Sequence, residues 1–219
     1  MSDSDTVVLV PMLGRAHMVA PLLESLRATC TARVLFCCTP GDRDVLRTLN
    51  AVGADYITVT HRPAGDYARK INAGYVATEE PLLFLGACDL RFHPGWLDAA
   101  RAVLTPSVGV VGTNDLGSPR VMAGEHSTHS LVTRSYVDKF GTIDELGKVL
   151  HEGYAHEYVD DELVGTAKYR GAWAFASDAR VEHLHPNWGK GTMDDLYLQQ
   201  QRRMKVSRQL YRARRQLWT

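Results

Sequence analysis

Short apolar runs alternate with helical patterns along the first half of the chain. An apolar run bounded by turn residues predicts a buried β-strand, and such runs occupy residues 6–11, 33–38, 56–60 and 82–85. Between them, apolar positions recur at helical spacing and predict helices over 18–29, 42–49 and 66–78. Strands that alternate with helices favour a mostly parallel sheet with right-handed crossovers, flanked by helices. The pattern therefore predicts an α/β fold.

The second half of the chain is less regular. Its apolar runs predict strands at 108–112, 129–134, 172–176 and 179–184. Helical patterns cover 143–150, 154–167 and the C-terminal segment 199–219. No repeat, low-complexity tract or linker separates the two halves, so we expect residues 1–219 to form a single α/β domain.

Composition fits a globular chain, because 45% of its 219 residues are hydrophobic and 23% are charged. The formal net charge of zero hides an asymmetry. The segment 199–219 holds no acid and seven basic residues, namely Arg202, Arg203, Lys205, Arg208, Arg212, Arg214 and Arg215. Removing these seven from the 25 basic residues leaves 18 against 25 acidic residues. The segment favours contact with phosphates or nucleic acid. An alternative, compatible with the first, is an amphipathic helix that packs on the domain through Met204, Leu210, Tyr211 and Leu217.

Cysteine usage and the absence of long apolar segments point to a reducing compartment. The sequence has no C-x-x-C motif, and its cysteines lie in apolar contexts, at Cys30, Cys37, Cys38 and Cys88. We expect buried free thiols. No apolar run has the length of a membrane span, and the N-terminus is acidic and unlike a signal peptide. We therefore expect a cytoplasmic protein with no membrane partner.

Chemistry-bearing residues follow several of the predicted strands. Asp89 comes directly after the apolar run at 82–85, where a parallel strand reaches the carboxyl edge at which α/β sheets bind ligands. Late in the sequence, His183 and His185 are two apart on a strand, so their side chains point to the same face. A carboxylate and imidazoles predict a metal site. Residues suited to binding a nucleotide follow the first three predicted strands, namely Arg15, Thr39 and Arg62.

Two common nucleotide-binding classes are disfavoured. There is no G-x-G-x-x-G after the first strand, which argues against a dinucleotide oxidoreductase. The stretch 189–192, Gly-Lys-Gly-Thr, lacks the preceding strand and the spacing of a phosphate-binding loop, which argues against a P-loop NTPase.

The order of these residues resembles the GT-A fold glycosyltransferases, in particular the small inverting enzymes of family two. The matching motifs are Val8-Leu9-Val10-Pro11 with Arg15, Arg69-Lys70-Ile71-Asn72-Ala73-Gly74, Leu83-Phe84-Leu85-Gly86-Ala87-Cys88-Asp89 and Pro94-Gly95-Trp96. The resemblance covers residues 6–100 well and the remainder loosely. It implies a GT-A (Rossmann-like) sheet, with a nucleotide-sugar-binding half at about 6–100, an acceptor and catalytic half at about 101–198, and a basic C-terminal helix at 199–219.

The resemblance implies an activity and a cofactor. We expect a metal-dependent, inverting transfer from a nucleoside-diphosphate sugar, which we take to be a UDP-sugar, to a hydroxyl acceptor. The cofactor is Mn²⁺ or Mg²⁺, and its predicted ligands are Asp89, His183 and His185. The residues predicted to position the donor are Pro11, Arg15, Thr39, Arg62, Lys70, Asn72, Ala87 and Cys88.

The resemblance also implies a general base in the acidic segment 156–163. A carboxylate there would remove the proton of the attacking acceptor hydroxyl. Asp160 and Asp161 are the candidates, whereas Glu162 could instead hold the helix end. The alternative is that these acids only stabilise a helix N-terminus through its dipole. His126 and His129 lie in a loop of acceptor character and have no assigned role.

One departure from the family pattern keeps other functions open. Cys88 stands where the family commonly has a second acid, and a thiol is a poor ligand for a hard cation. A degenerate, non-catalytic nucleotide-sugar-binding module is therefore one alternative. A nucleotidyltransferase is another, although residues 12–15 are poor in the glycine that its phosphate loop needs.

The acceptor is the least constrained partner. Small family members similar to this chain occur in phage genomes and are associated with glycosylation of hydroxymethylated DNA bases. That resemblance and the basic segment 199–219 make modified DNA a candidate acceptor, in the host cytoplasm if the chain is phage-encoded. A base in duplex DNA must be flipped out to reach such a site.

Overall fold

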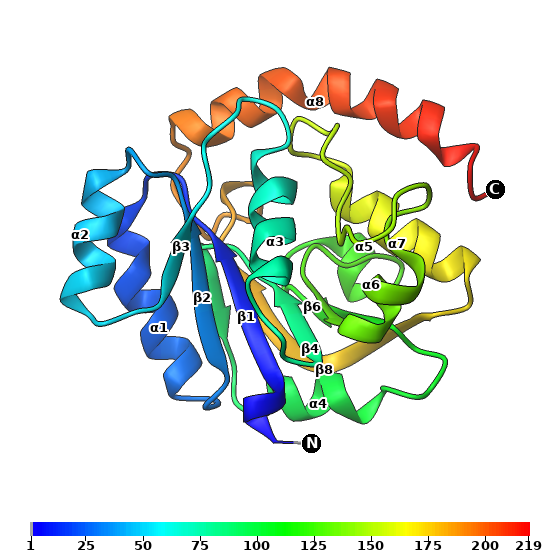
Figure 1. Ribbon diagram of the computed structural model, residues 1–219, viewed down its shortest axis with the longest axis horizontal. Helices are drawn as coiled ribbons and strands as arrows, with labels where there is room; N and C mark the ends of the chain where they lie inside the picture. The colour runs from blue at the N-terminus through cyan, green and yellow to red at the C-terminus, as the bar shows by residue number, and fades with distance from the viewer. Residues whose placement is uncertain (1) are drawn as a thin grey trace.

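The computed structural model describes residues 2–219, so Met1 of the predicted domain 1–219 lies outside the described residues. An eight-stranded sheet forms its centre, in the order β3-β2-β1-β4-β7-β6-β8-β5 (Figure 1). The strands are β1 (Thr6–Pro11), β2 (Arg33–Cys38), β3 (Tyr56–Thr58), β4 (Leu82–Leu85), β5 (Leu90–Phe92), β6 (Val110–Asn114), β7 (Ser130–Thr133) and β8 (Trp173–His183). Only β7 and β5 run against their neighbours. The predicted α/β fold with a mostly parallel sheet is confirmed.

Helices cover both faces of the sheet. They are α1 (Val19–Arg27), α2 (Arg43–Ala51), α3 (Asp66–Val76), α4 (Trp96–Ala102), α5 (Pro119–Met122), α6 (Arg134–Phe140), α7 (Val159–Tyr169) and α8 (Asp195–Arg215). Alternation along β1 divides the core, because successive strand residues point to opposite faces. Val8 and Val10 belong to the core cluster under α1, α2 and α4. Val7 and Leu9 belong to the cluster under α3, α6 and α7.

Several predicted boundaries change in the structure. The two strands predicted at 172–176 and 179–184 are one strand, β8, which pairs with β6 and then with β5 across a register shift. The helix predicted at 143–150 does not form. Gly147 has a φ of 71°, a left-handed conformation that no α-helix accommodates. The helix predicted over 154–167 begins only at Val159.

Asn72 explains the shape of that irregular segment. Its side-chain Nδ2 donates to the Leu150 carbonyl and to Glu152 Oε1, both at 2.9 Å. Its Oδ1 accepts from the amides of Val149, at 2.9 Å, and Leu150, at 3.0 Å. The residue is 4% exposed. All hydrogen-bonding positions of the amide are used, so the Asn72 side chain holds the loop at 149–152, and its predicted contact with a donor stays a prediction.

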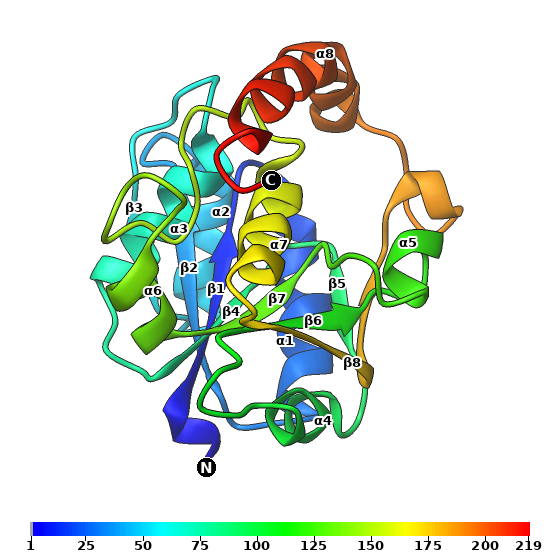
Figure 2. The ribbon, with the colours of Figure 1, turned by 90° about the vertical axis from the view of Figure 1, so that its right-hand side faces the viewer.

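The C-terminal helix α8 lies across the carboxyl edge of the sheet, above α7 (Figures 1 and 2). It is anchored near its end, where Arg214 donates to Glu162 at 2.8 Å and to Asp144 at 2.7 Å. Other basic residues of the helix remain exposed, namely Arg202, Lys205, Arg208, Arg212 and Arg215. The predicted packing is right for Leu210 and Tyr211, which contact the core, and wrong for Leu217, which is 51% exposed because it lies beyond the end of the helix. The helix therefore both packs on the domain and exposes basic side chains. Within residues 2–219, no helix combines the length and apolar character that crossing a bilayer requires.

We expect Asn72→Ala to lower the free energy of unfolding by about 2–4 kcal/mol, because buried amide and carbonyl groups of the 149–152 loop lose their partners. Urea denaturation measures this. Asn50→Ala is the matched control, since Asn50 is an exposed asparagine of α2. Unchanged stability combined with weaker nucleotide binding would instead restore the donor role of Asn72.

Candidate functional site

A cavity of about 220 Å³ opens at the carboxyl edge of the sheet, between α3, α7 and the first turns of α8. Nine of the residues predicted for the site line it, namely Pro11, Arg15, Lys70, Ala87, Cys88, Asp89, Asp160, His183 and His185. These residues lie together because the loops after β1 and β4 and the end of β8 meet at this edge of the sheet. Four predicted residues do not line the cavity, namely Thr39, Arg62, Asn72 and Asp161.

Asp89 is the buried carboxylate of the cavity, at 4% exposure. Its Oδ2 lies 3.4 Å from His183 Nε2 and 3.6 Å from Arg15 Nη1, and it accepts the hydroxyl of Tyr197. Pairing of β5 with β8 sets this geometry, since it places Leu90 opposite His183. Burial alone would raise the pKa of Asp89, but the hydrogen bond and charge of His183, with the Tyr197 hydroxyl, hold it well below its usual range.

His129 presents an unused nitrogen in the same cavity. It is 4% exposed, and its ring centroid lies 5.0 Å from that of His183. Its Nδ1 donates to the Leu85 carbonyl at 3.1 Å, so Nε2 carries the lone pair, and Nε2 is buried without a partner. Burial and the charge of His183 lower the pKa of His129 to about 4, which keeps the ring neutral. Sequence reasoning noted this histidine but assigned it no role.

His185 does not fit its predicted role as a ligand. Its Nδ1 accepts the Asn187 amide at 3.1 Å, so in the neutral ring Nε2 carries the proton and no lone pair is free. Burial and the charge of His183 lower the pKa of His185 to about 4, which favours the neutral ring. The ring packs edge-on against Tyr197, at 4.6 Å between centroids. The rings of His183 and His185 lie close together, 5.0 Å between centroids, but only His183 pairs with Asp89.

Residues at the start of α8 contact Arg15 and Asp89. Asp194 accepts from Arg15 Nε at 2.7 Å and Nη2 at 2.8 Å. The Arg15 guanidinium also lies 4.0 Å over the Tyr197 ring. No sequence pattern indicated Asp194 or Tyr197, because their partners precede them by more than a hundred residues.

Lys70 is a buried cation with three partners. Its Nζ donates to the Met12 carbonyl and to Asp66 at 2.6 Å, and to Thr39 Oγ1 at 3.0 Å. Thr39 does not line the cavity, and its contact with the site is the hydrogen bond that it accepts from Lys70. Arg62 is exposed and does not line the cavity, so the structure does not place it where it was predicted to position the nucleotide sugar.

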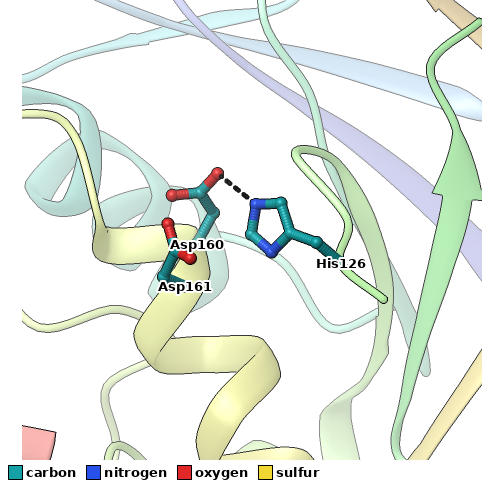
Figure 3. A group of neighbouring side chains, drawn as sticks. All are labelled: His126, Asp160 and Asp161. Atoms are coloured by element: carbon teal, nitrogen blue, oxygen red, sulfur yellow. Dashed lines mark hydrogen bonds and ion pairs between the residues drawn. The ribbon is translucent and has the colours of Figure 1, made fainter. Parts of the chain in front are cut away.

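The acidic residues at the start of α7 have different surroundings (Figure 3). Asp160 lines the cavity, and its Oδ2 accepts from His126 Nε2 at 3.2 Å. Asp161 accepts from Arg120 at 3.0 Å and lies off the cavity. Glu162 is buried against Arg214, as expected of a residue that holds the helix. Among residues 2–219, only His126, Asp160 and Asp161 bring three ligand atoms mutually within 4.8 Å.

Glu157 is another carboxyl residue of the cavity, and sequence reasoning did not single it out. Burial and the charges of Asp160 and Asp161 raise its pKa to about 7. A carboxyl with such a pKa can hold or release a proton near neutral pH.

The fold is similar to that of solved glycosyltransferases. The chain superposes on the mannosyltransferase PcManGT from Pyrobaculum calidifontis, in complex with GDP-Man and Mn²⁺, with a TM-score of 0.64 and 13% identity over 85% of this chain. It spans 58% of that protein's length. Glucosyl-3-phosphoglycerate synthase from Mycobacterium tuberculosis, in complex with Mn²⁺, UDP-Glc and phosphoglyceric acid, gives 0.61 and 14% over 91% of this chain and 77% of its own. The predicted GT-A fold is confirmed. No protein-family model and no curated protein matches the sequence.

We expect Glu157→Gln to stabilise the protein at pH 8 by about 1–3 kcal/mol and to change little at pH 4. The raised pKa means that the fold disfavours the carboxylate, so stability is lost as pH rises from the unfolded value of 4.5 towards about 7. Thermal unfolding at both pH values measures the difference. Glu24→Gln, on the exposed face of α1, is the control, and equal effects of both substitutions would contradict the burial argument.

Proposed function

We propose that the protein is a divalent-metal-dependent, inverting glycosyltransferase that uses a nucleoside-diphosphate sugar, most simply a UDP-sugar. The observation that carries the proposal is the approach of Asp89 to His183, at 3.4 Å, inside a cavity of a GT-A fold. The nucleotide-sugar and Mn²⁺ complexes of the similar structures support it.

The residues of the cavity fit a divalent metal. Asp89 offers an ionised carboxylate 3.4 Å from His183 Nε2, so these two residues can share one ion. His129 offers a buried nitrogen lone pair without a partner, but Asp89, His183 and His129 do not bring their ligand atoms mutually within 4.8 Å, so His129 would have to shift to complete the set. Burial raises the pKa of the Cys88 thiol to about 12, so it stays protonated and is a poor ligand. Mixed oxygen and nitrogen donors suit Mn²⁺ better than Mg²⁺. When bound, the metal would neutralise charge on the leaving diphosphate.

The remaining residues have roles in donor and acceptor handling. Arg15 carries a guanidinium that a diphosphate can engage in place of Asp194 through charge-assisted hydrogen bonds. Lys70 holds the loop after β1 through the Met12 carbonyl. Asp160 is the proposed general base: it lines the cavity, whereas Asp161 is engaged by Arg120. Inversion follows if this carboxylate deprotonates an acceptor that attacks opposite the leaving diphosphate.

We propose modified DNA, with a hydroxymethylated base, as the acceptor. Helix α8 supports this, because it borders the cavity at Gln199, Gln200 and Arg203 and exposes further basic side chains along its length. Such a surface neutralises phosphates without reading sequence. A base flipped from the duplex would then reach the adjacent cavity.

A degenerate binding module is the second candidate function. It is favoured by the Tyr197 hydroxyl and the Arg15 guanidinium, which already satisfy the Asp89 carboxylate without a metal. Cys88 in place of a second acid points the same way.

We expect Mn²⁺ to strengthen UDP binding in calorimetry, and Asp89→Asn to weaken the metal-dependent part by at least about tenfold, since it removes the anionic ligand. A panel of UDP-sugars with Mn²⁺ should show slow release of UDP, abolished in the same variant. Asp98→Asn, in the exposed part of α4, is the matched control. UDP affinity that ignores Mn²⁺, with no turnover of any donor, would favour the degenerate module.

We expect the triple substitution Arg202→Glu, Lys205→Glu and Arg212→Glu to weaken binding of duplex DNA and to reduce its salt dependence, by a slope of about 0.9 for each lost phosphate contact. Fluorescence anisotropy over a salt series measures both quantities. These residues are exposed, so the buried Arg214 anchor is retained. Lys139→Glu, exposed on α6, is the control. Unaltered DNA affinity in the triple variant would remove α8 as the acceptor surface.

A further inference from the structure

His126 lies beside Asp160 (Figure 3) and is not among the residues that line the cavity. The residue is 6% exposed, and its Nε2 lies 3.2 Å from Asp160 Oδ2. The imidazole end of this hydrogen bond is buried, whereas the Asp160 side chain is 27% exposed. A charge-assisted contact in such a partly buried place is stronger than one at a surface. One carboxylate oxygen of Asp160 thus accepts a hydrogen bond from His126, which lies outside the cavity and would not contact a bound substrate.

The loop that carries His126 is held on both sides. Lys168 of α7 donates to the Glu125 carbonyl at 2.7 Å, and the Glu125 amide donates to the Arg120 carbonyl at 3.0 Å. On the far side, the Thr113 amide of β6 donates to Ser127 Oγ at 3.1 Å. The imidazole is consequently a fixed support for the carboxylate.

The charges that face His126 come from two helices. Asp160 and Asp161 belong to α7, and Arg120 belongs to α5. Burial disfavours the charged imidazole, yet the hydrogen bond to Asp160 and the charges of both carboxylates outweigh burial and Arg120 and raise the pKa of His126 above its ordinary value. Conversely, although burial alone would raise the pKa of Asp160, the pairing with His126 lowers it.

We propose that His126 is a positioning residue for Asp160, holding Oδ2 so that Oδ1 faces the acceptor hydroxyl. The proposal rests on the glycosyltransferase function proposed above. In the transfer, the acceptor oxygen bonds to the anomeric carbon, the bond to the diphosphate breaks with its electron pair on the diphosphate, and the hydroxyl proton passes to Asp160. His126 keeps its own proton on Nε2 throughout.

A pH dependence follows from this arrangement. An imidazolium beside Asp160 lowers the proton affinity of the carboxylate, and a neutral imidazole still donates from Nε2 without adding that charge. Turnover should therefore rise with pH as His126 loses its second proton, with a midpoint above the ordinary value for histidine.

The test compares His126→Phe and His126→Gln in the full-length protein, with Mn²⁺ and the UDP-sugar that the unsubstituted protein hydrolyses fastest, water serving as acceptor. We expect His126→Phe to lower kcat about 10- to 100-fold with the donor KM within about twofold, since the support acts on proton transfer and not on the donor. His126→Gln keeps an N–H donor and should recover most of kcat while flattening the pH profile. His17→Gln, exposed before α1, is the control.

A second readout needs no turnover. In ¹⁵N-histidine NMR titrations, Asp160→Asn should lower the midpoint of His126. An unmoved midpoint, or full kcat in a folded His126→Phe protein, overturns the role of His126. Inactivity of the unsubstituted protein towards every UDP-sugar would instead overturn the glycosyltransferase function, and this role with it.

Discussion

The contact between Asp89 and His183 is the interaction on which the site depends. Removing a carboxylate from water costs several kcal/mol unless opposite charge and hydrogen bonds replace its hydration. Here His183, Arg15 and the Tyr197 hydroxyl supply that replacement. The β5–β8 ladder and the bond from the Leu184 amide to the Asp89 carbonyl, at 2.8 Å, bring the late histidine to the end of β4. The sheet thereby creates a buried, ionised carboxylate with nitrogen donors beside it.

Helix α8 contacts two parts of the site, the Arg15–Asp89 group and the start of α7. Its first turn engages Arg15 through Asp194 and Asp89 through Tyr197, and its last turn holds the start of α7 through Arg214 and Glu162. The helix carries the basic surface on its exposed side. One element thus combines contacts with Arg15 and Asp89, support for the helix that bears the proposed base, and an exposed basic surface.

Local pattern predicted the elements whose apolar residues are buried. Strands β1 and β4 are buried apolar runs, β2 is buried from Leu35 onwards, and Asp42 caps α2. The helix predicted at 143–150 failed because periodicity does not report a φ of 71° at Gly147 or the bonds from Asn72 that fix the loop. The role of Asn72 in holding that loop could not be predicted for the same reason: its partners lie about 78 positions away in the sequence.

By itself, the sequence determined that an acid follows a buried strand at the ligand-binding edge of an α/β sheet, because strand burial and turn chemistry are local properties. It also placed His183, Asp160 and Arg15 among the candidates. Only the tertiary structure decided which histidine faces Asp89, which acid lines the cavity, and that His126 supports it. Those outcomes depend on hydrogen bonds and desolvation between segments distant along the chain, which no spacing of residues encodes.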